Sequence, residues 1–97
     1  MSSYVIGQLN INDPGGYQSY LDGFQPRFDR HGGEPLASSK QDTEVLEGEW
    51  SLPRTVILRF PSQEDAPEWY EDPEYQALAD IRRRTAETNL VVIDGIS

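Results

Sequence analysis

The sequence contains no cysteine and a single histidine among its 97 residues. Without cysteine the chain forms neither disulfides nor thiolate metal sites, and zinc centres of the usual kind are excluded. Carboxylates alone leave other metal sites open, but no group of them has the spacing of a calcium-binding loop. We therefore expect neither a bound metal ion nor a cofactor.

The sequence also lacks a long apolar segment and an excess of basic residues. No apolar run approaches the roughly 18 residues that suggest a membrane span. The beginning of the chain has no basic segment followed by an apolar core, so it predicts no signal peptide, and we expect a cytoplasmic protein. The 17 acidic residues exceed the 8 basic ones, giving a net charge of −9, which disfavours binding to nucleic acids.

Four segments have the composition or the alternation of β-strands. The clearest is residues 54–60, which are rich in β-branched and aromatic side chains. The weakest is residues 34–50, whose apolar parts are Leu36–Ala37 and Val45–Leu46 on either side of a polar middle. In chain order the predicted strands are 4–11, 34–50, 54–60 and 90–95.

A first helical region follows the first strand. Asp13 is a suitable N-cap, and Pro14 fits the first helical position. Gly32–Gly33 predicts the end of the helix, with one glycine in the left-handed conformation. Helical spacing places one apolar stripe on this helix. The stripe consists of Tyr17, Leu21, Phe24 and Phe28 and continues to His31.

A second helical region, residues 61–89, is predicted in two pieces. Ser62 and Asp65 form a capping-box pattern. Pro67 would remove a hydrogen bond from a helix interior, so the helix either begins near Pro67 or is kinked there. Asp72–Pro73 repeats the cap of the first helix. The residues that then share one face are Tyr75, Leu78, Ala79, Arg82 and Ala86.

The resulting order is β-α-β-β-α-β, the split arrangement of ferredoxin-like folds. We expect an α+β protein: one ferredoxin-like domain over residues 1–97, with an antiparallel sheet and two helices on one face. Residues 55–60 and 90–93 of the predicted strands are apolar on both faces, whereas a sheet covered on one side should alternate apolar and polar residues. A second copy of the chain is the simplest cover, so we predict a symmetric homodimer through the open face of the sheet.

Several stretches together resemble a known family. They are YVIGQLNI at 4–11 with Asp13, Pro14, Tyr17 and Tyr20, HGG at 31–33, VLEGEW at 45–50, RTVILRFPS at 54–62, WYEDPEYQAL at 69–78, Arg82, and VVIDG at 91–95. In this order they are similar to the uncharacterised bacterial family named domain of unknown function 1330. The likeness covers nearly the whole chain.

This resemblance implies membership of the dimeric α/β-barrel superfamily, with a pocket between sheet and helices. That superfamily includes cofactor-free monooxygenases, lactone isomerases, haem-handling proteins and stress-response proteins, so the fold does not decide the function. The sequence departs from the family pattern at Pro67, where relatives tend to have a good helix former. It also departs at His31, where relatives often have tyrosine, so a histidine base is not required.

His31 and Glu47 are the candidate catalytic residues, as groups that can transfer a proton. The structural alternative for His31 is a histidine that packs at the end of a helix and bonds a carbonyl. Glu47 and Arg54 are expected to be neighbours across the turn between the second and third strands. There Arg54 would bind a carboxylate or enolate, or the two residues would form a structural ion pair.

Three further residues complete the candidate ligand-binding set. Trp69 and Tyr70 can line a pocket, although Trp69 and Tyr75 are equally suited to anchor the helix on the sheet. Arg82 lies on the inner face of the helix and needs a partner, either an anionic ligand or a carboxylate such as Glu47 or Asp94. The ligand-binding set is therefore His31, Glu47, Arg54, Trp69, Tyr70 and Arg82.

The sequence leaves three functions open. The first is a small homodimeric domain that binds a small organic molecule in a pocket between sheet and helices. The second is a cofactor-independent monooxygenase or isomerase of a small conjugated or aromatic acid. The third is a structural or regulatory interaction module without a pocket. No nucleophile elbow and no glycine-rich phosphate loop occurs in the sequence.

Overall fold

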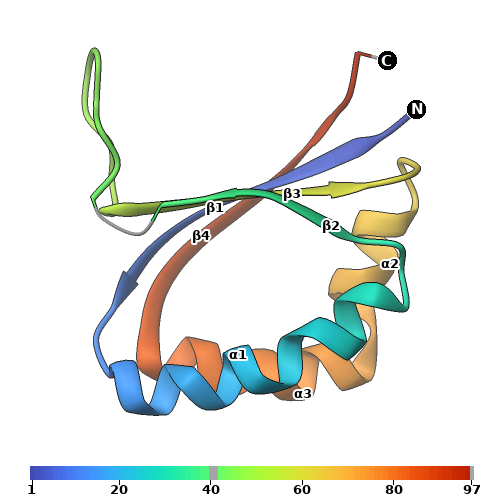
Figure 1. Cartoon of the computed structure of the whole chain (residues 1–97), viewed down its shortest axis with the longest axis horizontal. Helices are drawn as coiled ribbons and strands as arrows, with labels where there is room; N and C mark the ends of the chain where they lie inside the picture. The colour runs from blue at the N-terminus through green and yellow to red at the C-terminus, as the bar shows by residue number, and fades with distance from the viewer. Residues whose placement is uncertain (40–41, 97) are drawn as a thin grey trace.

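Four strands form one antiparallel sheet in the described chain, and three helices pack on one of its faces (Figure 1). The computed structural model describes residues 1–39 and 42–96. The strand order β2-β3-β1-β4 is that of ferredoxin-like proteins, as the sequence predicts. The elements are β1 (Ser3–Ile11), α1 (Pro14–Asp29), β2 (Glu34–Ser38), β3 (Arg54–Phe60), α2 (Asp65–Glu71), α3 (Pro73–Thr85) and β4 (Ala86–Asp94).

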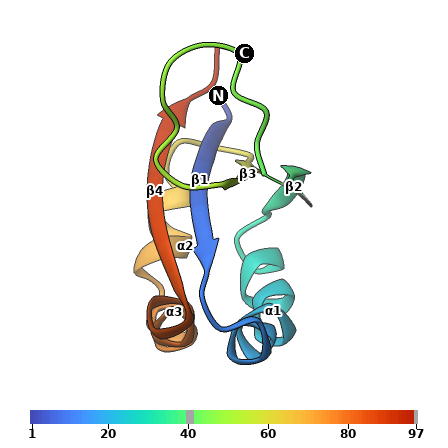
Figure 2. The same cartoon turned by 90° about the vertical axis from the view of Figure 1, so that its left-hand side faces the viewer.

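The central strand β1 separates the two faces of the sheet by its alternation. It pairs antiparallel with β3 and β4, and Gly7 lies opposite Val56 on one side and Leu90 on the other. Val5 faces the helices and is buried, whereas its neighbour Ile6 lies on the opposite face. Figure 2 shows that all three helices lie on the same side of the sheet.

The buried face of α1 differs by one residue from the predicted stripe. Leu21, which we expected to be buried, is 47 % exposed, and Tyr20 is buried in its place. The phenol ring of Tyr20 can be buried because its hydroxyl group finds a partner, the hydroxyl of Tyr75, at 2.8 Å. The buried residues of α1 are Tyr17, Tyr20 and Phe28.

Both ends of α1 lie close to the predicted positions. At its start the Asp13 carboxylate accepts a hydrogen bond from the backbone N–H of Gly16 at 3.1 Å. At its end Gly32 has a φ of 73°, a left-handed conformation that glycine adopts without steric cost. The N–H of Gly33 donates to the Phe28 carbonyl at 3.2 Å, which closes the last turn and directs the chain into β2.

The second helical region forms two helices, and Pro67 kinks neither of them. Pro67 is the third residue of α2, within the first turn, where backbone N–H groups have no partner inside the helix. Of the two predicted alternatives, the helix therefore begins just before the proline. The Ser62 hydroxyl accepts from the N–H of Asp65 at 3.3 Å. Asp72 caps α3 by accepting from the N–H of Glu74 at 2.9 Å.

The segment after β2 differs from the sequence prediction. Only Glu34–Ser38 forms a strand. The prediction that the strand region extends to Val45–Leu46 was wrong. These residues lie in the loop between β2 and β3, which rises from the sheet on the side away from the helices (Figure 1). Leu46 is 92 % exposed. Glu44 and Glu47 flank the Val45–Leu46 pair, and the low β propensity of glutamate and its need for solvent favour a loop. Positions 40–41 of the predicted polar middle lie outside the described residues.

The core is aromatic and lies at the α2 end of the sheet. Its largest fully buried side chains include Trp69, Tyr75, Phe28 and Phe60. The rings of Trp69 and Tyr75 are tilted against each other with centroids 4.2 Å apart. As predicted, Tyr75, Leu78, Ala79 and Arg82 lie on the buried face of α3. Ala86, which was predicted on the same helical face, instead begins β4, four residues before the predicted start of this strand.

The face of the sheet opposite the helices is apolar and is not covered by any helix of the described chain. Val91 and Ile93 of β4 are half exposed there, next to the side chains of β1. The apolar residues of this open face are Tyr4, Ile6, Ile57, Val91 and Ile93. None of the helices in the described segments is long and apolar enough to cross a membrane.

Candidate functional site

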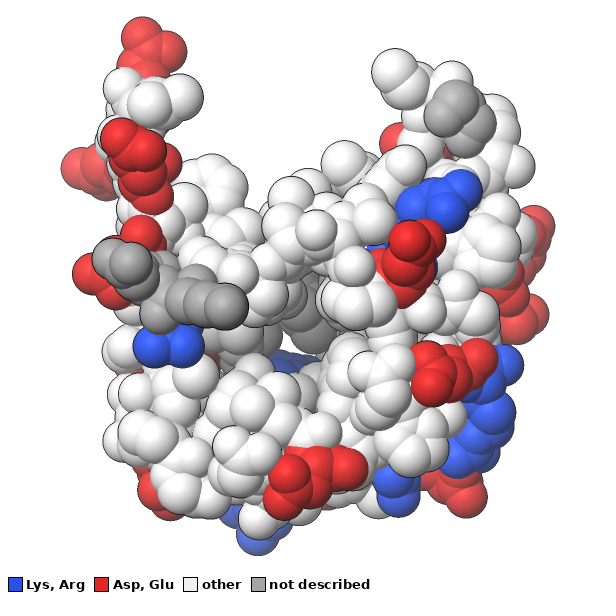
Figure 3. Space-filling model, viewed as in Figure 1, with Lys and Arg blue, Asp and Glu red and all other residues white. Residues whose placement is uncertain are grey.

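A cavity of about 260 Å³ lies between the sheet and the helices. The surface is visibly hollowed between the sheet and α1 in Figure 3. All seven elements contribute to its walls, because β1 and β4 bend toward the helices while β2 and β3 stay apart from α1 (Figure 1). The lining residues are Leu9, Tyr17, Tyr20, Leu21, Phe24, Gln25, Pro35, Ala37, Ser38, Val56, Leu58, Trp69, Tyr75, Arg82, Thr88 and Leu90.

Three polar atoms of the residues that line this cavity are buried without a hydrogen-bond partner in the described chain. They are Nε1 of Trp69, Nε of Arg82 and Oγ1 of Thr88. Each buried polar group without a partner destabilises a protein by about 1–3 kcal/mol, so such groups are rare and need an explanation. All three line the same cavity. A bound molecule with acceptor oxygens would supply the missing hydrogen bonds.

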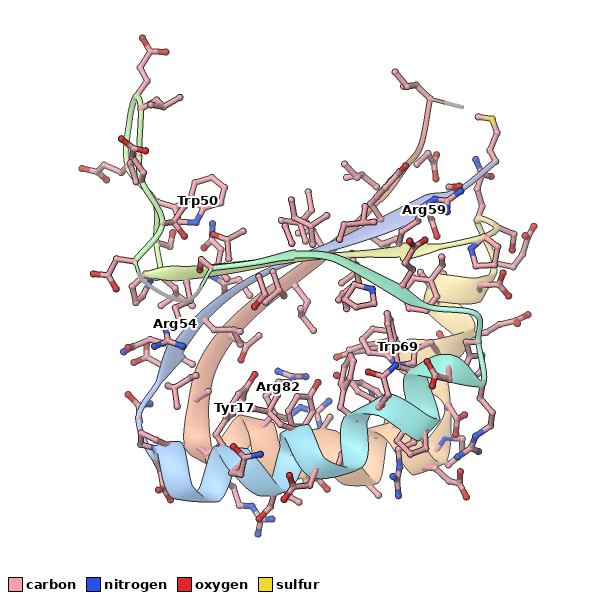
Figure 4. All side chains as sticks on the ribbon, viewed as in Figure 1. Tyr17, Trp50, Arg54, Arg59, Trp69 and Arg82 are labelled. Carbon is pink, nitrogen blue, oxygen red and sulfur yellow. The ribbon has the colours of Figure 1, made fainter. Side chains whose placement is uncertain are left out.

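Arg82 is the most unusual member of this group. Its side chain is 5 % exposed, and no ion pair joins it to a carboxylate anywhere in residues 1–39 and 42–96. The carboxylate partners predicted from the sequence, Glu47 and Asp94, do not contact it. Its guanidinium carbon lies 5.9 Å from the centre of the Tyr20 ring, at the distance of a cation–π contact. Arg82 therefore presents an uncompensated positive charge to the cavity (Figure 4).

Tyr17 and Tyr20 are neutral hydrogen-bonding groups on the walls of the cavity. Burial raises the pKa of Tyr20 far above that of a free phenol, and the neighbouring Tyr75 adds to the effect. Burial also raises the pKa of Tyr17, although the charge of Arg82 opposes this. A phenol with a raised pKa keeps its proton at neutral pH, so these hydroxyls can donate to a ligand but are weak bases.

No histidine or carboxylate is among the described residues that line the cavity. The walls are otherwise apolar and aromatic. Nor does any group of three or more histidine, aspartate or glutamate side chains in the described segments have the geometry to hold a metal ion. The arrangement can therefore bind an anion and bury a flat apolar body, and it contains no obvious proton acceptor.

The structure places His31 outside this cavity. Its Nε2 atom lies 2.9 Å from Oδ2 of Asp72, the residue that caps α3. The bond connects the end of α1 to the start of α3, and both side chains are largely buried. The hydrogen bond from His31, and then that from the backbone of Glu74, lower the pKa of the Asp72 carboxyl. This geometry corresponds to a structural histidine at a helix end, although it bonds a carboxylate instead of a carbonyl.

The other predicted residues are divided between the cavity and the surface. Trp69 and Arg82 line the cavity, but Glu47 lies exposed in the β2–β3 loop. No ion pair joins Glu47 to Arg54 in the described residues. Tyr70 is 40 % exposed on the outer side of α2. The structure does not bring the six candidates together at one site.

Arg54 and Tyr70 line hollows other than this cavity, and one groove beside Tyr70 is also lined by Arg82 and Thr88. Arg54 begins β3 and points to the helix side of the sheet, where it lines a hollow next to Tyr17 (Figure 4). Tyr70 lines two surface grooves near β4. A hydrogen bond from the Arg83 guanidinium lowers the pKa of the Tyr70 phenol.

Sequence reasoning did not identify Thr88 and Tyr20 as site residues. Thr88 follows the two-residue alternation of β4 and so shares the helix side of the sheet with Leu90, a signal that was available in the sequence. Tyr20 lies three residues after Tyr17, which also fits a helical stripe. The choice between Tyr20 and Leu21 depends on Tyr75, which is remote in sequence.

A family model described as "Domain of unknown function (DUF1330)" matches residues 2–96. No protein with a curated description matches the sequence. The match agrees with the stretches that suggested this family from the sequence alone.

Several solved structures share the fold. The methylated RPA0582 protein superposes with a TM-score of 0.77 at 17 % identity, over 99 % of this chain and 82 % of that one. The unmodified protein, of unknown function and from Rhodopseudomonas palustris, gives 0.74 at 16 % identity over 99 % and 83 %. SnoaB, described as a cofactor-independent oxygenase from Streptomyces nogalater, gives 0.68 at 10 % identity over 99 % and 94 %. A dimeric ferredoxin-like protein of unknown function from Thermobifida fusca gives 0.62 at 11 % identity over 98 % and 92 %.

Proposed function

Since this chain belongs to the family described as Domain of unknown function (DUF1330), which names no activity, we propose a function from the cavity itself. We propose that the protein binds a small, flat organic acid between its sheet and its helices. The observation that carries this proposal is that three residues line one cavity and each has a buried polar atom without a partner: Trp69, Arg82 and Thr88.

The chemistry of the walls defines the ligand class. An anionic oxygen of a carboxylate, enolate or phenolate would accept hydrogen bonds from Nε of Arg82 and from the hydroxyl of Thr88, and would neutralise the arginine. The remaining walls, such as Tyr17, Phe24 and Leu90, are suited to an aromatic or conjugated body. At about 260 Å³ the cavity is at or just below the lower end of the range usual for ligand pockets, which favours a small molecule.

A second candidate function is cofactor-independent oxygenation or isomerisation of such an acid. It is favoured by the fold shared with SnoaB, which is described as a cofactor-independent oxygenase. Arg82 would stabilise the substrate anion. Because no histidine or carboxylate is among the described lining residues, the substrate would have to arrive already ionised. Oxygen consumption with acidic phenols, measured on wild type and Arg82→Gln, tests this function.

We also propose that two copies of the chain associate through the open face of the sheet. Half-exposed Val91 and Ile93 support this, because an apolar sheet face of this kind is rarely left to solvent. Similar structures from Thermobifida fusca and Jannaschia are described as dimeric, although at 11 % and 12 % identity they share only the fold. The third function, an interaction module without a pocket, is disfavoured by the cavity. The cytoplasmic location stays a prediction, which cell fractionation would test.

Mass spectrometry of small molecules that copurify with the native protein, followed by calorimetric titration, tests ligand binding. We expect aromatic and conjugated carboxylates to bind, and Arg82→Gln to weaken them by about 10- to 100-fold, the value of a charge-assisted hydrogen bond. Arg82→Lys retains the charge without the fork geometry and should recover only part of the affinity. Arg84→Gln, at an exposed arginine of the same helix, is the matched control. Equal affinities for wild type and Arg82→Gln would contradict the proposal.

A further inference from the structure

A second hollow adjoins the cavity at the end of the sheet where β3 begins. Arg54, Asn10 and Gln18 contribute polar groups to its walls. Tyr17 and Leu21 line both hollows, so the two hollows share these side chains. The second hollow has about 380 Å³ and opens toward solvent, whereas the cavity beyond Tyr17 is more apolar.

Arg54 and Arg82 differ from the other arginines of the chain. The other five each donate a hydrogen bond or form an ion pair: Arg27, Arg30, Arg59, Arg83 and Arg84. For Arg54 and Arg82 the described part of the chain contains neither a side-chain hydrogen bond nor an ion pair. Asp42 lines the second hollow with Arg54 but forms no ion pair with it.

Both unpartnered arginines act on the same tyrosine. The charges of Arg82 and of Arg54 each oppose the rise that burial causes in the pKa of Tyr17. Figure 4 shows Arg54, Tyr17 and Arg82 together on the helix side of the sheet. In a protein with a net charge of −9, two positive charges without a counter-ion among the described residues flank Tyr17, which lines both hollows. An arginine without a carboxylate partner is suited to bind an anionic group of a ligand.

We propose that the ligand carries two acidic groups, one bound by Arg82 in the cavity and one bound by Arg54 in the second hollow. This inference rests on the proposed function and narrows it to small aromatic or conjugated dicarboxylic acids. The apolar body of the ligand lies against Tyr17 and Leu21, which line both hollows. The inner group is bound more strongly, because Arg82 is buried and Arg54 is exposed to competing water and salt.

Calorimetric titration with three matched compounds tests this inference. They are phenylacetate, 1,4-phenylenediacetate and the monomethyl ester of the latter, which has the size of the diacid but a single charge. We expect wild type to bind the diacid about fivefold more tightly than the monoester, a value suited to an exposed charge pair. Arg54→Gln should bind the two equally and leave the affinity for phenylacetate unchanged. Arg84→Gln should keep the fivefold preference.

The outcomes separate this inference from the proposed function. If phenylacetate binds through Arg82 but the diacid and its monoester bind equally to wild type, the inference is wrong and the proposed function stands. A preference that survives in Arg54→Gln also overturns the inference. If none of the three compounds binds, the proposed function fails and the inference fails with it. The circular dichroism spectrum of Arg54→Gln verifies that the variant is folded, which is expected for an exposed residue at the start of a strand.

Discussion

The imidazole of His31 bonds the carboxylate of Asp72 across 2.9 Å, and this contact joins the end of α1 to the cap of α3. His31 is the only histidine of the chain, and this contact gives it a structural role that requires no catalysis. It also makes the stability of the fold depend on pH, because the bond holds the pKa of Asp72 below its ordinary value.

The first prediction concerns acid unfolding. The unfolded chain binds a proton at Asp72 with a pKa of about 4, and the folded protein only at lower pH. The contribution of Asp72 to stability is therefore present above about pH 4 and is lost as the pH falls through the folded pKa. Asp72→Asn keeps a good helix cap but cannot ionise. Urea unfolding measures the free energy of unfolding of both proteins. The amount by which Asp72→Asn is less stable than wild type should decrease as the pH is lowered from 7 to 2. A deficit that is constant over this range would contradict the assignment.

The second prediction separates His31 and Glu47 from the ligand. Neither residue lines the cavity, so His31→Ala and Glu47→Gln should bind aromatic carboxylates as wild type does, within about a factor of two. His31→Ala should lower the thermal midpoint, since it removes the bond to Asp72, and Glu47→Gln should not, since its side chain is exposed. Calorimetry and thermal unfolding measure the two effects. A large loss of affinity in either variant would show that the substituted residue takes part in ligand binding after all.

The third prediction concerns the buried pair of hydroxyls on Tyr20 and Tyr75, which are 2.8 Å apart. Tyr20→Phe leaves the Tyr75 hydroxyl without a partner and should destabilise the protein by about 1–2 kcal/mol. The double variant Tyr20→Phe with Tyr75→Phe removes both groups and should lose less than the sum of the single variants. Urea unfolding measures all three. Strict additivity would mean that the two hydroxyls do not depend on each other.

The fourth prediction concerns Gly7, which has no side chain at the point where β1 passes the cavity wall. A Cβ atom there would lie 2.8 Å from Cδ2 of Leu90 and 3.0 Å from Cγ2 of Val56, and both side chains line the cavity. Gly7→Ala should displace the Leu90 and Val56 side chains into the cavity and reduce its volume. The variant should therefore lose more affinity for larger ligands than for smaller ones, and its free energy of unfolding should fall by about 1–3 kcal/mol. Titration with a size series of aromatic acids measures this. Gly15→Ala is the control, because only Asp13 lies near its Cβ, at 3.7 Å. An equal loss of affinity for ligands of all sizes would contradict the claim that Gly7→Ala reduces the volume of the cavity.

The fifth prediction concerns the open face of the sheet. Val91 is 56 % exposed on this face, and Val91→Asp places a charge within the proposed dimer interface. We expect wild type to sediment as a dimer at micromolar concentration and Val91→Asp as a folded monomer. Ala77→Asp adds the same charge to the exposed side of α3 and should remain dimeric. A wild-type monomer in this experiment would rule out the proposed association.

Local rules predicted much of the fold. The caps at Asp13 and Asp72, the glycine stop at Gly32 and the alternation of β1 are determined by residues that are near one another in sequence. Local signals were insufficient for the segment 34–50, where two apolar residues suggested a strand that has no partner to pair with. They also could not choose between Tyr20 and Leu21, since the choice depends on a hydroxyl of another helix.

The site was less predictable than the fold. The sequence indicated that Arg82 faces inward and needs an anion, because helical spacing fixes the face on which a residue lies. It did not indicate that Thr88 and Trp69 face the same space without partners, since three elements must come together to form that space. It expected Glu47 and Arg54 to be neighbours, but the loop between β2 and β3 rises away from the sheet.

The sequence by itself determined the order of strands and helices, the ends of α1 and the start of α3, because these depend on spacing and on backbone conformation within a few residues. Only the tertiary structure decided where the unsatisfied groups gather. The curvature of the sheet leaves a cavity above α1, and within it the positions of Arg82, Trp69 and Thr88 depend on packing between elements distant in sequence. Hydrogen bonds and ion pairs form only between groups a few ångströms apart, so the partner of each group is known only when the chain is folded.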